Sequence, residues 1–315
     1  MVLLDEKYII NAGIDWNRTI DVIEDAVRCI GNSDFSQPIK PYLRYRNLRN
    51  RIIAMPAFVG GDINMAGIKW IASFPDNIKQ GVPRAHSVVI LNNADTGEPV
   101  GIFCTALLSI IRTASVSGLL LRHFIRQRNP DKVKVGITGF GPIGQYHLKM
   151  CQALLGERIE RISLFDIRPI DAVLTDAYDN VEVVDTWEAA FQSADIFITC
   201  TVSDAPYINI PPKPGSLHLN VSLRDYRTDV YPWFKGAIIV DDWEEVCREK
   251  TDIEMLHLEQ GLQKEDTRSI VDVVNGDCLA QFPPDAPVMF NPMGMAVFDI
   301  AIGSYYLKQA PVPAV

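Results

Sequence analysis

The sequence predicts an α/β protein in which a doubly wound parallel sheet is joined to a separate α+β domain. From Val133 onward, short β-rich runs alternate with helical segments, as in parallel sheets whose strands are connected by helices. The run "KVGITGF" leads directly into a glycine-rich loop and then a helix. The preceding hundred residues are instead rich in strands that follow one another with few helices between them.

The first part of the chain begins with a helix over residues 15–30, where Ile20, Ile23 and Val27 recur at helical spacing. Five strands are predicted next, the fourth closing on the turn sequence "ADTGEP": "YLRYR", "RIIAMPAFVG", "AGIKWIAS", "AHSVVILNN" and "VGIFCTAL". Residues 105–128 then form one or two helices, which Asn129-Pro130 ends.

The second part alternates strands and helices. A helix over 142–156 is followed by strand "RISLFDIR", another helix, strand "VEVVD", helix "TWEAAFQSA" and strands "DIFITCTV", "SLHLNVS" and "GAIIVDDW". A last helix, apolar at 295, 297, 298, 300, 302 and 305, is expected to return to the first domain. We therefore expect one domain from residues 1–118 with 290–315 and a second from 119–289.

The composition is that of an ordinary globular protein, 48% apolar and 22% charged. The net charge of −9, without a basic tract, disfavours nucleic acid and anionic membranes as partners. The start "MVLLDEKYII" lacks the basic region of a signal peptide, and no apolar run approaches the roughly 20 residues of a membrane span. Six scattered cysteines indicate reduced thiols, and five histidines without ligand spacing indicate no metal. We expect a cytoplasmic protein.

The glycine loop predicts a Rossmann dinucleotide site. Gly139 permits a tight turn, Gly141 lets the backbone approach a pyrophosphate, and Gly144 lets helix and strand pack closely. The helix N-terminus offers free N–H groups to the phosphates. Asp166 ends the next strand, 22 residues after Gly144, and favours NAD by accepting hydrogen bonds from the ribose, although nearby Arg168 would suit a 2′-phosphate. The alternative is a glycine turn that binds no nucleotide.

Four basic residues in the first domain are candidates for binding an anion. Lys69 stands in an apolar strand, where burial is costly without an anionic partner. Arg112 lies in mid-helix among small and apolar residues. Lys40 and Arg44 lie four apart and would share one face of a strand, where they would bind a carboxylate. The alternatives are solvated strand faces for the lysines and Arg44, and a structural ion pair or a snorkelling side chain for Arg112.

Asp225 is the candidate general base. It follows a strand of the second domain, and ligands of doubly wound sheets bind outside the carboxyl ends of the strands. Arg224 and Arg227 flank it and would either hold it ionised or lie on the surface. The alternative for Asp225 is a turn or capping residue. Together, the two domains predict a metal-free redox site for a carboxylate-bearing substrate.

The order of several motifs resembles the ornithine cyclodeaminase/mu-crystallin family over nearly the whole chain. The motifs are "MPAFVGG…GIKW", "TGEPVG", "IIRTASVS" and the late glycine loop. Other stretches are similar to one branch, which oxidatively cleaves N-(2-amino-2-carboxyethyl)-L-glutamate to supply 2,3-diaminopropionate for siderophores and peptide antibiotics: "DFSQPIKPYLRY", "RIIAMPAFVGG", "ITCTVSDAPYI", "IVDDWEEVCREK" and "FNPMGMAVFDI". The resemblance implies a homodimer in which the first domain makes substrate and dimer contacts. It also implies NAD-dependent oxidation of a Cα–N bond to an imine that water hydrolyses.

The resemblance assigns roles to single positions. Lys69 and Arg112 match residues that bind the substrate carboxylate, the family's early basic residue falls at Lys40 or Arg44, and Asp225 matches an acid that activates water or moves a proton. The positions implied to bind the cofactor are Arg84, Arg112, Gly139, Gly141, Pro142, Ile143, Gly144, Asp166, Thr201, Ser222, Met293 and Gly294. Arg224 and the short segment 262–288 depart from the branch, which leaves the exact substrate open.

The rival interpretations are of two kinds. Within enzymes, the chain would be an ornithine or lysine cyclodeaminase that recycles NAD, or an imino or keto acid reductase of the alanine dehydrogenase or ketimine reductase type. Outside enzymes, it would be a mu-crystallin-like protein that holds a nucleotide without chemistry. Net NADH production separates the dehydrogenase from the cyclodeaminase. The presence of Lys69, Arg112 and Asp225 together disfavours the non-enzyme.

Overall fold

A mixed sheet of seven strands lies at the centre of the first unit of the computed structural model, which describes residues 1–310. The strand order is β1-β7-β6-β5-β4-β2, with β3 paired to β4, and all pairings are antiparallel except β1 with β7. The strands are β1 (Val2–Leu4), β2 (Phe35–Ser36), β3 (Tyr42–Leu43), β4 (Arg51–Val59), β5 (Met65–Ser73), β6 (Ala85–Asn93) and β7 (Pro99–Phe103). This unit comprises Met1–Ser115 and the described residues from Gly294 onward. The last five residues of the segment expected at 290–315 lie outside the described residues.

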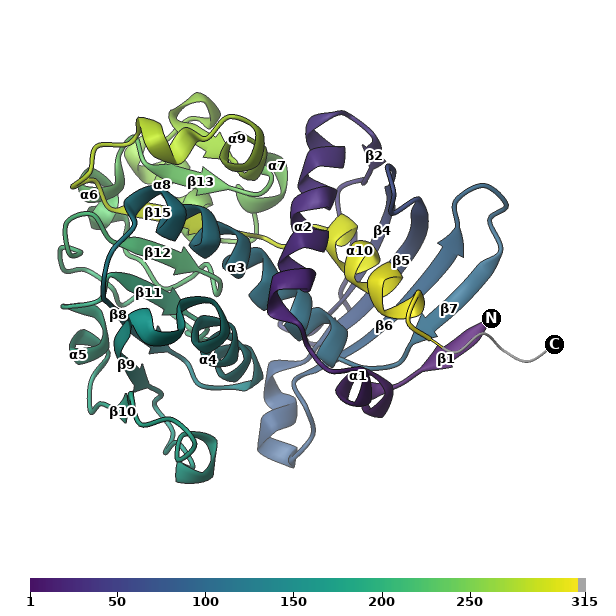
Figure 1. Ribbon diagram of the computed structural model, residues 1–315, viewed down its shortest axis with the longest axis horizontal. Helices are drawn as coiled ribbons and strands as arrows, with labels where there is room; N and C mark the ends of the chain where they lie inside the picture. The colour runs from purple at the N-terminus through teal and green to yellow at the C-terminus, as the bar shows by residue number, and fades with distance from the viewer. Residues whose placement is uncertain (311–315) are drawn as a thin grey trace. The chain divides into compact units, whose positions relative to one another are not determined.

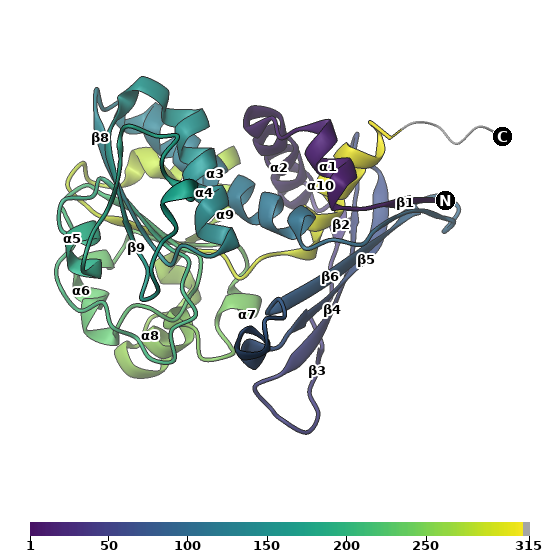
Figure 2. The ribbon, with the colours of Figure 1, turned by 90° about the horizontal axis from the view of Figure 1, so that it is seen from below.

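Helices cover one face of this sheet. Helix α10 (Ala296–Leu307) packs on β4, β5 and β6, and α2 (Trp16–Gly31) packs on α10 (Figure 2). The alternation along β4 buries Met55, Ala57 and Val59 on the helical side. The short helix α1 (Glu6–Ala12) and the turn η1 (Pro75–Gln80) complete the connections. The C-terminal helix thus completes the first unit, as its apolar spacing predicted.

An eight-stranded parallel sheet forms the second unit, Val116–Met293, in the order β10-β9-β8-β11-β12-β15-β13-β14 (Figure 1). The strands are β8 (Val133–Thr138), β9 (Ile159–Phe165), β10 (Val181–Val183), β11 (Ile196–Thr199), β12 (Leu217–Asn220), β13 (Ile238–Val240), β14 (Thr267–Ser269) and β15 (Val288–Asn291). The helices are α4 (Pro142–Leu155), α5 (Trp187–Phe191), α6 (Tyr231–Phe234), α7 (Trp243–Val246), α8 (Asp252–Gln260) and α9 (Ile270–Asn275). The order reverses direction at β8 and β11, as in doubly wound sheets. The predicted fold class is confirmed.

One helix spans both units. Residues 105–128 were expected to form one or two helices, and they form the single helix α3 (Leu107–Arg128), within which the division between the units falls. By length and composition alone, α3 would be able to cross a membrane. Yet 78% of its most apolar window is buried inside the protein, which is the packing of a core helix.

Two sequence predictions about elements were wrong. The helix expected between β9 and β10 is only the short 3-10 turn η3 (Ala172–Leu174). Pro169 and the turn-forming residues Asp171, Asp179 and Asn180 explain this, and the Asp171 side chain caps η3 by accepting from Val173 N. The strand expected at "YLRYR" is reduced to Tyr42–Leu43.

Candidate functional site

The glycine loop joins β8 to α4 in the geometry that its sequence predicts. Gly139 adopts a φ of +84°, and a Cβ there would lie 2.5 Å from the backbone carbon of Cys200. A Cβ on Gly144 would lie 2.1 Å from the carbonyl oxygen of Gly139, so helix and strand approach as closely as glycine allows. Pro142 occupies the first turn of α4 and Ile143 follows it.

The N-terminus of α4 has room for an anion. Its N-cap, Gly141, makes no side-chain capping bond, and a Cβ there would meet no protein atom within 4 Å. The first N–H groups of a helix have no partner within the helix and carry its positive dipole end. The open space above Gly141 therefore fits the pyrophosphate of a dinucleotide.

Asp166 ties the end of β9 to the glycine loop. Its Oδ2 accepts a hydrogen bond from Phe140 N (2.7 Å). Its Oδ1 accepts from Arg168 N (2.9 Å) and from Arg168 Nε (3.3 Å). Arg168 is therefore paired with the acid that would meet a ribose, and its charge is already partly offset.

Asp225 is fully buried after β12, where sequence analysis placed it. One carboxylate oxygen accepts a hydrogen bond from the Thr201 hydroxyl and the other accepts one from the Ser222 hydroxyl. Leu223, within the same loop, has a φ of +63°. The structure thus joins three predicted site residues around one carboxylate, and the two hydroxyls fix its orientation.

The two arginines that flank Asp225 contact groups other than its carboxylate. Arg224 donates to the carbonyl oxygen of Glu249 from Nη2 (2.8 Å) and from Nε (3.3 Å). Arg227 is exposed and pairs with Asp229 at 3.4 Å. Of the two alternatives expected for Arg227, the structure therefore shows the surface charge.

A second acid, Asp252 in α8, supports the Asp225 loop and was missed by sequence analysis. Its Oδ2 accepts hydrogen bonds from Asn220 Nδ2 (2.8 Å), Asp225 N (3.2 Å) and Tyr226 N (3.3 Å). Burial raises its pKa to about 7; the hydrogen bond from Asn220 lowers the pKa and the nearby Asp225 charge raises it further. In the sequence, Asp252 resembles an ordinary acid in the first turn of a helix, so no signal distinguished it.

A cation cluster is buried in the first unit. Lys69 Nζ donates to Ser109 Oγ (2.6 Å) and to Asp299 Oδ1 (3.0 Å), and Arg112 Nε donates to the same Asp299 oxygen (3.2 Å). Lys69 is 1% exposed and Asp299 0%, which removes the solvated-face alternative for Lys69. Burial lowers the pKa of Lys69 to about 8; Asp299 opposes this, while Arg112 and Lys40 lower the pKa further. Asp299 was not predicted, although a lone acid in the apolar run "AVFDIAIG" is a signal of the same kind as Lys69.

Lys40 and Arg44 do not share a strand face, and that prediction was wrong. Lys40 is 3% exposed and donates from Nζ to the carbonyl oxygen of Gly294 (2.9 Å). Arg44 is exposed, with its guanidinium 5.2 Å from the centre of the Tyr42 ring. Pro41 follows Lys40 directly and lacks an N–H for a sheet, so the strand does not reach Lys40.

The remaining predicted positions lie in both units. Arg84 is half-buried just before β6, and its carbonyl oxygen accepts from Phe74 N (2.9 Å). Met293 N donates to Asp241 Oδ1 (2.9 Å) at the end of β15. Gly294 has a φ of +86°, and a Cβ there would lie 2.8 Å from Arg112 Nη1, so a glycine is needed beside that guanidinium. Within residues 1–310, no group of three His, Cys, Asp or Glu side chains would hold a metal ion.

A comparison with known families gives one match over almost the entire chain. The model of the ornithine cyclodeaminase/mu-crystallin family matches residues 5–309. Among characterised relatives, the N-((2S)-2-amino-2-carboxyethyl)-L-glutamate dehydrogenase of Staphylococcus aureus is 33% identical, over 98% of this chain and 95% of that protein. The resemblance seen in the sequence is therefore confirmed at the level of the family.

Solved structures share the fold. The Delta(1)-pyrroline-2-carboxylate reductase of Thermococcus litoralis, solved with NADH and L-proline, superposes with a TM-score of 0.87 at 20% identity, covering 98% of this chain and 97% of that one. An archaeal alanine dehydrogenase dimer with bound NAD superposes with a TM-score of 0.80 at 20% identity, covering 97% of this chain and 94% of that one. At these identities, the likeness shows the fold.

Proposed function

The chain belongs to the ornithine cyclodeaminase/mu-crystallin family, and from this premise we propose that it is an NAD-dependent dehydrogenase that acts on a CH–NH bond and cleaves N-(2-amino-2-carboxyethyl)-L-glutamate. The products are L-2,3-diaminopropionate and 2-oxoglutarate. The substrate is oxidised by two electrons at the glutamate Cα–N bond, and one water molecule is consumed. We assign the reaction to the cytoplasm and to the supply of 2,3-diaminopropionate for siderophores or peptide antibiotics.

The observation that carries this proposal is the 33% identity to a dehydrogenase of that substrate across 98% of the chain. The buried charges of the first unit support it. Lys69 and Arg112 are two buried cations that share one oxygen of the Asp299 carboxylate, an arrangement that favours a further anionic ligand. The proposed substrate carries three carboxylates. An ornithine cyclodeaminase would meet only one carboxylate and a cationic side chain.

The glycine loop fits the proposed cofactor. Gly141 leaves open space at the uncapped N-terminus of α4, and Asp166 stands at the end of the next strand. NAD, when bound, supplies the acceptor for the hydride that leaves the substrate Cα. Lys69 and Arg112 would bind substrate carboxylates through charge-assisted hydrogen bonds, with Lys40 adding positive potential. Such positioning of a reacting carbon contributes several kcal/mol, on the order of the proximity effect.

Asp225 would handle the protons. The substrate nitrogen loses a proton as the Cα–H bond breaks, and the resulting imine adds water at carbon before the C–N bond breaks. The carboxylate of Asp225 is an acceptor that would orient this water and take its proton. Thr201 and Ser222 hold the two carboxylate oxygens in place through their hydroxyl groups. No protein nucleophile is required.

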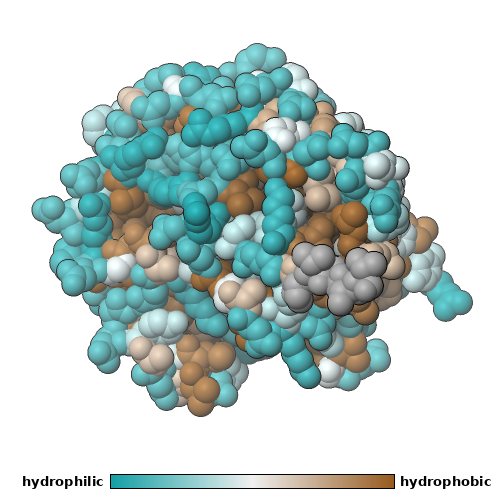
Figure 3. All heavy atoms as spheres, turned by 45° about the vertical axis from the view of Figure 1, so that its right-hand side comes forward, coloured by the Kyte–Doolittle hydropathy of each residue, from teal (hydrophilic) through white to brown (hydrophobic). Residues whose placement is uncertain are grey.

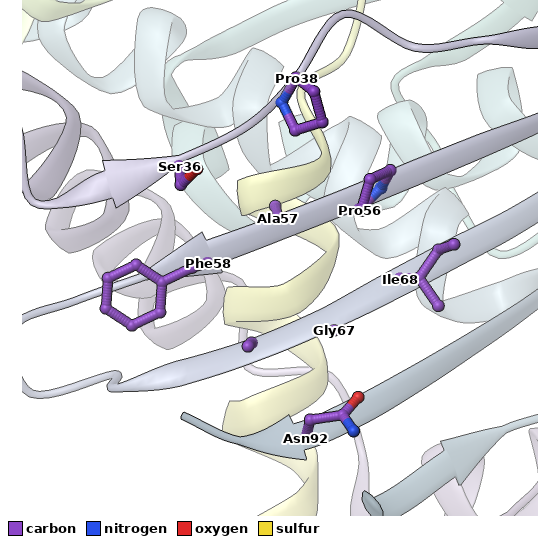
Figure 4. Close-up of a pocket in the computed structure, with 9 residues that line it drawn as sticks. Ser36, Pro38, Pro56, Ala57, Phe58, Gly67, Ile68 and Asn92 are labelled. Atoms are coloured by element: carbon purple, nitrogen blue, oxygen red, sulfur yellow. The ribbon is translucent and has the colours of Figure 1, made fainter. Parts of the chain in front are cut away.

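We also propose that the protein is a homodimer that uses the helix-free face of the first unit's sheet. Alternate residues there are apolar, and Trp70 is 43% exposed. A hollow of about 320 Å³ lies on this face, and Figure 4 shows residues that line it on the side of the strands away from α10. Its lining residues are Ser36, Pro38, Pro56, Ala57, Phe58, Ala66, Gly67, Ile68 and Asn92. On the side of the molecule that Figure 3 draws, hydrophobic residues form several patches between hydrophilic ones. A second copy would cover such a face from water.

The test is NADH absorbance with purified protein and NAD, with N-(2-amino-2-carboxyethyl)-L-glutamate in one cuvette and ornithine in another. The proposal expects NADH only in the first, together with 2,3-diaminopropionate and 2-oxoglutarate in equal amounts. Ammonia and proline from ornithine, without net NADH, would instead identify a cyclodeaminase. NADH consumed with Delta(1)-pyrroline-2-carboxylate alone would identify a reductase.

A matched variant, Asp225→Asn, keeps the size of the side chain and removes its charge. It should bind NADH with the affinity of the wild type and lose turnover by about 100-fold or more, the typical contribution of a general base. Near-normal turnover in this variant would exclude Asp225 from the mechanism.

A further inference from the structure

Asp299 is a buried carboxylate in the first turn of α10, where its neighbours Phe298 and Ile300 are both fully buried. Its Oδ1 accepts from both Lys69 Nζ (3.0 Å) and Arg112 Nε (3.2 Å). Among residues 1–310, its Oδ2 has no hydrogen-bond partner. Burying a charge costs several kcal/mol unless its partners compensate. A carboxylate that uses one oxygen for two cations is therefore a feature to explain.

The groups around Lys69 come from three other elements. Asp299 belongs to α10, Arg112 and Ser109 belong to α3, and Lys40 belongs to the segment between β2 and β3. Lys69 itself lies on β5. Its register partners on the two neighbouring strands are apolar: Met55 on β4 and Val89 on β6. Asp299 is thus the negative charge that Lys69 and Arg112 both contact.

We propose that Asp299 is a positioning residue that keeps Lys69 protonated at neutral pH, so that Lys69 meets the substrate carboxylate as a cation. The inference rests on the proposed function only in naming that carboxylate. Two cations that face each other in a buried site repel. The lysine can end this repulsion by losing its proton, whereas the arginine keeps its own. The carboxylate oxygen that Lys69 Nζ and Arg112 Nε share offsets the repulsion, so the lysine keeps its proton.

The direction of the effect follows from the charges. Burial lowers the pKa of Lys69 to about 8, and Asp299 is the largest influence in the opposite direction. An opposite charge within 4–6 Å shifts a pKa by roughly 1–3 units. With the charge removed, the pKa of Lys69 would fall by this amount, and its protonated fraction at neutral pH would drop by up to about tenfold for each unit.

The decisive experiment follows Lys69 itself and needs no substrate. Protein labelled with ¹³C and ¹⁵N at the lysine side-chain ends is titrated by NMR, and the Lys69 signal is assigned from its absence in Lys69→Arg. In Asp299→Asn, the titration midpoint of Lys69 should fall by at least about one pH unit. In Asp299→Glu, which keeps the charge, it should stay near that of the wild type. An unchanged midpoint in folded Asp299→Asn would overturn the proposal.

Two further variants separate charge from packing. Ser109→Ala removes the other hydrogen bond to Lys69 without removing a charge, so the midpoint should move far less than in Asp299→Asn. Arg112→Met removes a cation, so the midpoint should rise. This opposite shift keeps the proposal testable even if Asp299→Asn does not fold, and a midpoint that fails to rise would contradict the electrostatic account.

Kinetics supply a second readout once turnover has been established. At pH ~7.5, the KM of Asp299→Asn should rise about tenfold or more, and it should return to within about twofold of the wild type at pH ~5.5, where Lys69 is protonated again. In Lys69→Arg/Asp299→Asn, this recovery at low pH should be absent, because arginine stays charged. A loss in Asp299→Asn that persists at low pH would indicate a merely structural role. If no substrate is turned over, the proposed function fails while the NMR titration still decides the role of Asp299.

Discussion

Replacing Gly144 and Gly141 in turn by alanine tests the nucleotide loop, because the two positions differ in what a methyl group would meet. At Gly144 the new Cβ would lie 2.1 Å from the carbonyl oxygen of Gly139, whereas at Gly141 nothing lies within 4 Å. The first change disturbs the protein, and the second disturbs only a ligand that occupies the open space. The pair therefore separates folding from binding.

The cost at Gly144 follows from the atom that must move. The Gly139 oxygen is backbone, and Gly139 is held by its φ of +84° and by the bond from its N to Phe165 O (2.8 Å). Overpacking costs about 1–3 kcal/mol, and a backbone obstacle places this case near 3 kcal/mol. The melting temperature should fall by about 6–12 °C at roughly 2–4 °C per kcal/mol. Gly141 has a φ of −70°, which alanine adopts readily, so Gly141→Ala should melt within about 2 °C of the wild type.

For NADH binding, the informative substitution is the one at Gly141. A methyl group at Gly141 holds the pyrophosphate away from the α4 N-terminus and removes at least one charge-assisted hydrogen bond, worth about 1.5–3 kcal/mol. The affinity for NADH, measured by fluorescence titration, should therefore fall at least about tenfold. Wild-type NADH affinity in Gly141→Ala would refute the placement of the pyrophosphate. Wild-type melting of Gly144→Ala, measured by circular dichroism, would refute the packing argument.

Three other predictions concern different parts of the chain. Burial raises the pKa of Asp252 from its ordinary value of 3.8 to about 7 in the folded protein. The raised pKa therefore contributes to the free energy of unfolding in full below pH ~4, and this contribution is lost as the pH rises through about 7. The unfolding free energy of the wild type relative to Asp252→Asn, from urea titrations, should fall by up to about 4 kcal/mol between pH ~4 and ~8, and a flat difference would contradict the cause. Asp166→Ala should lower the preference for NAD over NADP, as the ratio of the two kcat/KM values, by about tenfold, because Arg168 then loses its carboxylate partner; an unchanged ratio would remove Asp166 from cofactor choice. Trp70→Glu should convert a dimer to a monomer in light scattering while circular dichroism stays unchanged, and a persistent dimer would exclude the proposed interface.

Local patterns made most of the fold predictable. Periods of 2 and 3.6 residues located the long strands β4, β5 and β6 and the helices α2, α4 and α10 within a few residues. The glycine loop was predictable for the same reason, since the tight turn at Gly139 and the close packing at Gly144 are demands on adjacent backbone. The helix expected between β9 and β10 failed because turn-forming residues there stabilise an irregular connection instead.

The sequence by itself determined that this chain contains a dinucleotide-type α/β sheet and that Lys69, Arg112 and Asp225 are charges in need of an explanation. Only the tertiary structure decided their partners. Asp299 lies 230 positions from Lys69 in the chain, and Asp252 lies 27 from Asp225, yet each makes direct hydrogen bonds to the other member of its pair. The state of a buried charge depends on how much water is removed and which groups replace it. Both quantities come from segments that meet only when the chain has folded, so no local pattern contains them.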